Sequence, residues 1–495
     1  MKTRTALMYA LTSAAGVLLA AGCMVGPKYV APQVPVDANQ AFAHSQPGPV
    51  SADANDVVRL DGWWERFADG VTADLVAKAL DNNYDLKAAA SRVVQARSMF
   101  EQARGRALPQ VSYNLSRDRS QRSFNLGAGP FGGGRFSVLN ETWQQDFSVT
   151  YLLDFFGKIR HAERAAMQDM LASQANQQAL MNSLIAQVVA ARINIATLQR
   201  RLAIAWANTE SRRRTLEIVE RRYSQGLVGP VDLRLARENL ASSEAVEPSV
   251  ELQLITAGHT LDVLLGRTPG RSDDLAQTLP DLPDLEPVPV GLPVALLDRR
   301  PDIRAAEHSL RSANEQVGVS IAQLFPDLTL TGVWGRSGDT WENLWMDETE
   351  IYSAVFSLAQ PIFRGGQIKA QINAAKARYE ELAATYASVI LTALREVEDA
   401  LITERLLQEQ LSHARRQLDE AAAAEELSRD RYQRGVESIL TVLESERRRR
   451  LGQEQVAILM GQIWTARVNL FLALGGDWVL DVDDENRQDA KHMKG

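Results

Sequence analysis

The chain has one cysteine, Cys23, and six histidines among its 495 residues. A single cysteine excludes an internal disulfide and any metal site built from several thiolates. The histidines never stand with carboxylates at a metal-ligand spacing such as HExxH. The glycine run Gly132–Gly134 lacks the Gly-Lys-Ser/Thr of a phosphate-binding loop. The sequence therefore contains no recognisable metal or nucleotide motif, and we expect no metal or dissociable cofactor.

Net positive charge is also missing, since 62 acidic residues outnumber 54 basic ones and give a formal charge of −8. That balance speaks against nucleic acid as the main partner. The arginine run Arg447–Arg450 follows Glu444 and Glu446 on an expected helix. We interpret it as a salt-bridged or solvated helix face rather than a site for anionic ligands.

Proline is absent from two long stretches, residues 157–222 and 366–431. At about 1.5 Å per residue, each would form a helix near 100 Å long. Each stretch ends at the motif Arg-Tyr-x-x-Gly, which closes at Gly226 and Gly435, where glycine can take the left-handed conformation that ends a helix. Return helices are expected at 231–265, interrupted by Pro248, and at 440–474. The sequence thus predicts two very long helical hairpins.

The whole pattern occurs twice. Asp85 and Pro109 recur as Asp302 and Pro326, each 217 residues later, whereas the Arg-Tyr-x-x-Gly motif recurs after 209. The difference falls where the first copy carries a glycine-rich insert, residues 127–136. Two copies of one unit indicate one structural design built twice. We expect a helix over 74–106 in the first copy and its counterpart from Pro301 in the second.

Each copy also predicts a β-hairpin. Apolar and polar residues alternate from Val111 to Ser116 and from Phe147 to Leu153, and again after Pro326 and from Tyr352 to Leu358. Four strands of roughly ten residues cannot close a barrel alone, and an open sheet in lipid would leave backbone groups unpaired. Two chains would give eight strands and three would give twelve, and the alternation does not choose between them.

The long helices suggest assembly for a second reason. Apolar residues of the first stretch step in a heptad pattern, at Leu184, Val188, Ala191, Ile195, Leu198 and Leu202. Such seams on thin hairpins are expected to bury themselves against neighbouring helices. An oligomeric tube, part β-barrel and part helical barrel, meets both requirements.

The N-terminus has the form of a secretion signal. Lys2 and Arg4 precede a short apolar core, which ends at Leu-Ala-Ala-Gly-Cys with Cys23 last. This resembles a bacterial lipoprotein cleavage box, so we expect a diacylglycerol and an N-acyl lipid on Cys23. Met24 follows instead of aspartate, which favours sorting to the outer membrane.

Several motifs together resemble the TolC-like outer-membrane efflux factor family, in its lipoprotein branch. They are Asp61–Phe67, Tyr151–Arg160, Gly291–Glu307, Pro361–Gln367 and both Arg-Tyr-x-x-Gly turns. The resemblance implies a homotrimer with a twelve-stranded transmembrane β-barrel in the outer membrane, continued by an α-helical barrel in the periplasm. It also implies a passive, non-enzymatic exit duct. Its helical tips, at Gly226 and Gly435, would dock a periplasmic adapter that joins it to an inner-membrane pump, expected to be of the RND type.

The same resemblance places a gate at these tips. Tyr432 and Asp232 match the latch positions of the family, but Glu437 stands where the latch arginine belongs, and Arg431 or Arg434 are the candidates to replace it. Leu440 and Glu444 lie four residues apart on one helical face. We expect Leu440 to form an apolar constriction and Glu444 a cation-favouring carboxylate ring, in which three like charges raise each other's pKa. The other interpretation is seam packing for Leu440 and a solvated charge for Glu444.

The expected organisation is a signal peptide at 1–22, an extended leader and equatorial segment at 23–73, repeats at 74–290 and 291–476, and an equatorial tail at 477–495. Export of drugs or other small toxic compounds is the favoured function. A type I protein-secretion duct shares the expected fold and stays the alternative. A periplasmic adapter or structural coiled-coil lipoprotein is the third class, but it would not need two barrel-forming hairpins.

Overall fold

The computed structural model describes residues 24–32, 42–44, 63–64, 69–125, 135–270 and 299–476. The signal peptide, Cys23, most of the glycine-rich insert and the tail at 477–495 lie outside these residues. The chain divides into two compact units, which we describe separately. The first comprises Met1–Pro32, Val93–Ser173 and Ala306–Tyr386, and the second comprises Gln33–Arg92, Gln174–Ala305 and Ala387–Gly495.

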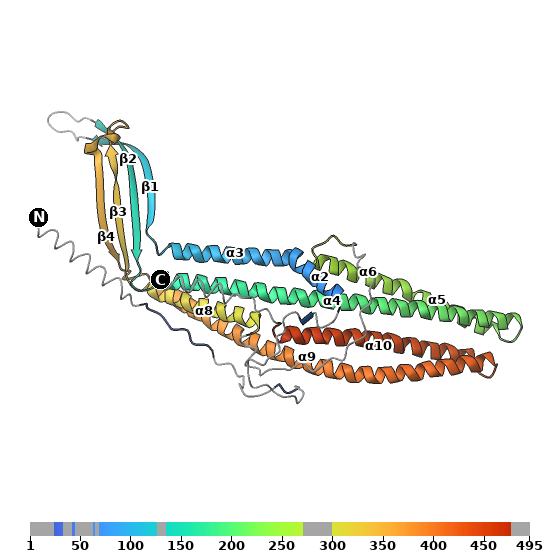
Figure 1. Cartoon of the computed structure of the whole chain (residues 1–495). Coiled ribbons are helices and arrows are strands. Elements are labelled where there is room, and N and C mark those ends of the chain that lie inside the picture. The colour runs from blue at the N-terminus through green and yellow to red at the C-terminus, as the bar shows by residue number, and fades with distance from the viewer. Residues whose placement is uncertain are drawn as a thin grey trace, which may run out of the picture. The chain divides into compact units, whose positions relative to one another are not determined.

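The first unit contains a four-stranded antiparallel sheet in the order β1-β2-β3-β4 (Figure 1). Its strands are β1 (Gln110–Asn125), β2 (Arg135–Leu153), β3 (Asp327–Gly338) and β4 (Glu350–Ala359). The two predicted hairpins are confirmed. The predicted length of roughly ten residues is wrong for the first hairpin, whose strands have 16 and 19 residues. Beyond Leu115 both faces of β1 turn polar, so the alternating pattern ends although backbone pairing continues to the stacked rings of Phe124 and Phe136.

The sheet has one largely apolar face and one largely polar face. The register aligns Tyr113, Phe147, Trp334 and Tyr352 in one row across all four strands. The adjacent row on the opposite face contains Ser112, Ser148, Val333 and Ser353. All four aromatic side chains of the first row are exposed within the chain. An apolar outer face and a polar inner face are typical of strands in a transmembrane barrel.

The two proline-free stretches form α4 (Lys158–Ser224) and α9 (Gln367–Gln433), each of 67 residues. The return helix of the second copy is α10 (Ile439–Ala473), whereas that of the first copy is split into α5 (Pro230–Glu244) and α6 (Val246–Leu264). Pro248 explains the split, since its ring would clash with the carbonyl of Glu244, four residues earlier, in a continuous helix. Both predicted hairpins, and the interruption, are confirmed.

The helix expected at 74–106 is instead two helices, α2 (Gly70–Asn82) and α3 (Tyr84–Gly105). Asn83 lies between them with an extended backbone, and its side-chain oxygen accepts from the backbone N–H groups of Asp85 and Leu86 at 2.9 and 3.0 Å. It caps α3 while its amide donates to the carbonyl of Leu264 at 2.9 Å. The counterpart in the second copy, α8 (Pro301–Ala322), begins at the expected proline.

The heptad seam of α4 is buried within the chain itself. Five of its six residues are at most 7 % exposed, and only Ala191 is partly buried. Leu184, Val188 and Ile195 pack in the second unit against side chains such as Val397, Val468 and Phe471. Leu198 and Leu202 pack in a separate cluster with Val250. The expectation that this seam requires neighbouring chains is therefore wrong, and the argument for assembly rests on the sheet edges. α4 and α10 each contain an apolar segment long enough to cross a membrane. However, 56 % of this segment in α4 and 61 % in α10 is buried within the chain, as in packed core helices.

Candidate functional site

Both Arg-Tyr-x-x-Gly motifs form the same helix end. Gly226 and Gly435 have φ of +71° and +78°. The backbone of a residue with a side chain would be strained at these angles. At the first turn, Leu227 N–H donates to the Arg222 carbonyl and Gly226 N–H to that of Tyr223, both at 2.9 Å. The second turn repeats both bonds at 3.0 Å. This is the Schellman pattern, so the arginine and tyrosine carbonyls of the motif are the ones that close each helix.

Tyr432 is buried at the second turn, with 4 % of its surface exposed. It packs in a small apolar cluster between the two hairpins, together with Val219, Ile439 and Val442. The guanidinium of Arg222 lies 4.7 Å from the centre of its ring, and Arg222 Nη1 donates to the Tyr432 carbonyl at 2.5 Å. Arg222 thereby joins the turn of the first copy to that of the second.

The two candidate latch arginines pair with other carboxylates than Asp232. Arg431 lies 3.5 Å from the Glu437 carboxylate, and Arg434 pairs with Asp430 at 2.9 Å. Among the described residues the Tyr432 hydroxyl has no hydrogen-bond partner, and Asp232 acts on it only through its charge. Burial and the Asp232 charge raise the pKa of Tyr432, while Arg222 opposes them. The signal for Arg222 was present in the sequence, because it belongs to the repeated motif.

Leu440 and Glu444 both lie on the exposed side of α10, near its start. Ser438 caps the helix by accepting from the Leu440 N–H at 3.1 Å, and the Leu440 side chain is 58 % exposed. Glu444 receives hydrogen bonds from Arg447 at 2.8 and 2.9 Å and from Arg448 at 2.8 Å. This confirms the salt-bridged interpretation of the arginine run.

These two arginines lower the pKa of Glu444 from 4.5 to about 2. The expected rise of this pKa comes from the Glu444 carboxylates of two other copies around a common axis, and it stays a prediction for the assembled trimer. Within the chain the hydrogen bonds from Arg447 and then Arg448 stabilise the ionised form. Glu444 is therefore a carboxylate over the whole physiological pH range, partly balanced by adjacent positive charge.

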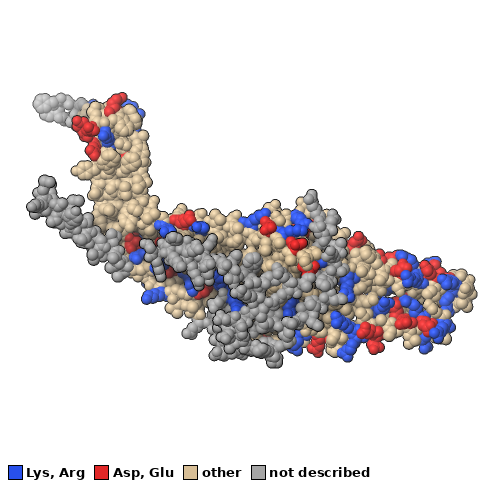
Figure 2. Space-filling view, in the orientation of Figure 1, with Lys and Arg blue, Asp and Glu red and all other residues tan. Residues whose placement is uncertain are grey.

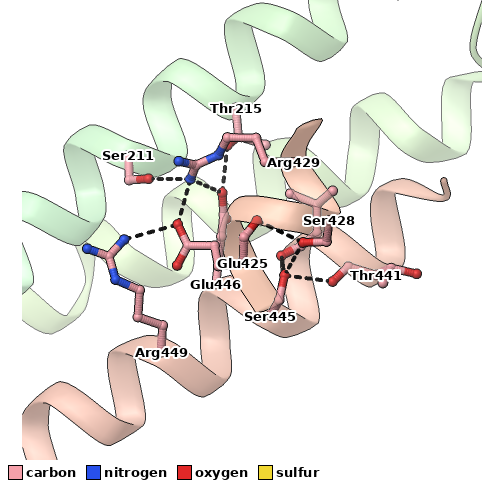
Figure 3. A network of polar contacts seen from close by, with 10 residues as sticks. Ser211, Thr215, Glu425, Ser428, Arg429, Thr441, Ser445, Glu446 and Arg449 are labelled. Carbon is pink, nitrogen blue, oxygen red and sulfur yellow. Dashed lines mark hydrogen bonds and ion pairs between the residues drawn. The ribbon is translucent and has the colours of Figure 1, made fainter. Parts of the chain in front are cut away.

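The opposite side of α10 carries a buried ionic network that sequence reasoning missed (Figure 3). Glu446 accepts from Thr215 of α4 at 2.7 Å and from Arg429 of α9 at 3.1 Å. Glu425 accepts from Arg429 at 2.8 Å and from Arg449 at 3.1 Å. Both carboxylate side chains are at most 5 % exposed. The network joins α4 of the first copy to α9 and α10 of the second, on the side of α10 opposite to Leu440 and Glu444.

The described residues that follow Cys23 are held against the first unit. Val25 N–H donates to the Phe156 carbonyl at 3.2 Å, and His161 Nε2 contacts the Val25 carbonyl at 3.0 Å. The other His161 nitrogen lies 2.5 Å from the Glu315 carboxylate. Met24 fills the space where a Cβ on Gly157 would stand. Met24 and Val25 therefore lie beside the junction of β2 and α4.

Comparisons with known proteins agree with this architecture. The family model described as outer membrane efflux protein matches residues 75–267 and 292–476. The chain is 31 % identical to outer membrane protein OprJ of Pseudomonas aeruginosa, over 99 % of this chain and 98 % of that protein. It is 30 % identical to the toluene efflux pump outer membrane protein TtgF of Pseudomonas putida, over 92 % of this chain and 94 % of the relative.

Among solved structures, the outer-membrane channel OprN superposes with a TM-score of 0.82 at 28 % identity. The match covers 92 % of this chain and 100 % of OprN. The family consists of outer-membrane channels of efflux pumps and not of enzymes. By its family match, its relatives and its fold, the chain belongs to the outer membrane efflux protein family.

Proposed function

We propose that three copies of this chain form the exit duct of a tripartite efflux system that exports small toxic organic compounds. The observation that carries the proposal is the sheet, with its apolar face, its polar face and two edges that pair on one side only among the described residues. Three copies give twelve strands with the polar face toward the lumen. The name of the toluene-exporting relative supports a small organic cargo.

The helical tips are the proposed gate and docking point. In three copies, Leu440 would narrow the pore and Glu444 would give its entrance a preference for cations. The turns at Gly226 and Gly435 expose Leu227 and Val436, at 62 % and 63 %, which supports docking of a periplasmic adapter there. The adapter would connect the duct to an inner-membrane pump of the RND type.

Lipidation of Cys23 would add a membrane anchor to the barrel. Two contacts hold residues 24–27 in the first unit, near the end of β2 that leads into α4. Val25 bonds to Phe156, and Asn314 donates to the Pro27 carbonyl at 3.2 Å. An acyl group on Cys23 would therefore start near the periplasmic surface of the membrane. We therefore propose a diacylglycerol and an N-acyl chain on Cys23 and a location in the outer membrane.

The purified protein in planar bilayers tests the duct and its gate together. Native mass spectrometry should give a trimer, and the trimer should show cation-preferring channels whose preference weakens in Glu444→Ala. A trimer without conductance would contradict the duct. Unchanged conductance and cation preference in Glu444→Ala would contradict the gate alone.

A further inference from the structure

The two edge strands of the sheet carry opposite charges. β1 contains Arg117, Arg119 and Arg122 with a single acid, Asp118, and so has a net positive charge. β4 begins at Glu350, and Asp347 and Glu348 lie just before it. Figure 2 shows that the charged side chains of the sheet gather at one end, while the rest of its visible surface is uncharged. Opposite charges on the two edges would complement each other if a β1 met the β4 of another copy.

The strand ends limit how such a pair can align. Along the rows of the sheet, Gln110 is level with Val355, so β4 continues for residues 356–359 below the start of β1. Glu350 is level with Leu115, so β1 continues for residues 116–125 above the start of β4. If every residue of β4 is to pair with the β1 of a neighbouring copy, β4 must be displaced along that β1 relative to the row alignment within one chain. The displacement, called the shift below, is at least four residues toward Asn125.

The two faces of the sheet restrict the shift further. An odd shift would turn the apolar side chains of one strand toward the polar side chains of the other, so the shift is even. The shear number of a barrel is the total register shift, in residues, accumulated once around it. With three seams, shifts of four or six residues per seam give shear numbers of 12 or 18. A shear equal to the strand number tilts strands by about 36°, and one half as large again by about 47°. The first value lies within the tilt of about 35–45° in outer-membrane barrels and the second just above it, whereas shifts of two or eight give about 20° and 55°.

We propose that the arginine edge of β1 binds the acidic start of β4 in a second copy of this chain, with Arg119 paired to Glu350 across each seam. This inference rests on the proposed trimeric duct and adds the register and the ionic contact that close it. A shift of four places Glu350 opposite Arg119, and a shift of six places it on the adjacent diagonal. Both lie within reach of long side chains.

The contacts within the chain leave this pair available. The Arg119 side chain is 59 % exposed. It lies 3.9 Å from the Glu141 carboxylate, which pairs more closely with Arg117, at 2.6 Å. Glu350 is exposed and accepts from Trp334 Nε1 at 2.7 Å. A carboxylate has room for further donors. The same shifts also set the apolar residues of β4, such as Phe356, against Tyr113 or Leu115.

Cross-linking tests the register directly, because Cys23 is the only native cysteine. In the double variant Arg119→Cys/Glu350→Cys, a thiol cross-linker that spans about 8 Å, the diagonal distance in a sheet, should link chains into covalent trimers. Arg135→Cys/Glu350→Cys is the control, since β2 is an inner strand, and should give no link between chains. Native trimers that resist linking at 119 and 350 would overturn the proposal. A chain that is monomeric by native mass spectrometry would instead contradict the proposed function.

Charge reversal tests the ionic contact. Arg119→Glu should lower by a few degrees the temperature at which trimers dissociate in SDS, because like charges then face each other at three seams. Adding Glu350→Arg should restore most of the loss, and Arg135→Glu should have no effect. Failure of Glu350→Arg to restore the Arg119→Glu variant would overturn the pairing.

Discussion

Arg222 and Tyr432 are 210 residues apart in the sequence, yet the guanidinium of the first lies over the ring of the second, 4.7 Å from its centre. Each comes from one of the two Arg-Tyr-x-x-Gly turns. The contact therefore fastens the two helical hairpins of a chain to each other at their tips. Any outward movement of one hairpin past the other must break it.

Removal of this contact is predicted to loosen the proposed gate at the tip. The stacking and the hydrogen bond to the Tyr432 carbonyl together contribute about 1–2 kcal/mol per chain. Arg222→Ala should therefore raise the open probability several-fold in single-channel recordings. The neighbouring Arg221→Ala is the matched control and should leave it unchanged. Equal open probabilities in the two variants would mean that the contact does not hold the tip closed.

Loss of a buried carboxylate is predicted to destabilise the helical region. Glu446→Gln weakens the bonds to Thr215 and Arg429, which should cost on the order of 2 kcal/mol, typical for hydrogen bonds to a buried charged group. The midpoint of thermal unfolding, followed by circular dichroism, should fall. Glu444→Gln, two residues away on the exposed side of α10, should shift it little. Similar shifts in both variants would contradict the distinction between the two sides of the helix.

The arginines beside Glu444 are predicted to make the ion preference of the channel insensitive to acid. Because its folded pKa of about 2 lies below the ordinary 4.5, the stabilising charge is present above pH 4.5 and is lost only as the pH falls toward 2. Cation preference should thus change little between pH 7 and about pH 3.5.

The double variant Arg447→Gln/Arg448→Gln removes both hydrogen-bond donors of Glu444. Its cation preference should be stronger at pH 7 and should fall as the pH passes the ordinary carboxyl value. Reversal potentials in a salt gradient measure both proteins. An unaltered channel that titrates near pH 4.5 would rule out the pairing in the assembled duct.

Lipidation is predicted to be dispensable for assembly, because the proposed barrel would anchor the protein without it. Cys23→Ser, supplied with a conventional signal sequence, should still yield outer-membrane trimers, detected by membrane fractionation and SDS-resistant migration. Complete loss of these trimers would show that the acyl anchor is required.

Much of the fold could be predicted because its signals are local. Alternation places the strands, the lack of proline permits the 67-residue helices, and the glycines mark the turns. The break at Asn83 was missed because it depends on a side chain that caps α3 and bonds to Leu264, 181 residues away. The full length of β1 was missed because residues 116–125 form its second part without any alternation of apolar and polar side chains.

The site was predictable only in part. Leu440 and Glu444 follow from the family resemblance together with their spacing on one helical face, and their role in a gate stays a prediction. Glu446 is only two residues beyond Glu444, which rotates it about 200° around α10 and turns it inward. What it meets there, Thr215 and Arg429, depends on how α4, α9 and α10 pack, and a single sequence does not contain that information.

Dye accumulation in living cells tests the central claim most directly. Cells that lack this gene should accumulate more of a fluorescent efflux substrate than the parent strain, and a plasmid copy of the gene should reverse the effect. In a strain without other exit ducts but with the cognate pump and adapter present, unchanged accumulation would contradict the assignment as a drug-efflux duct.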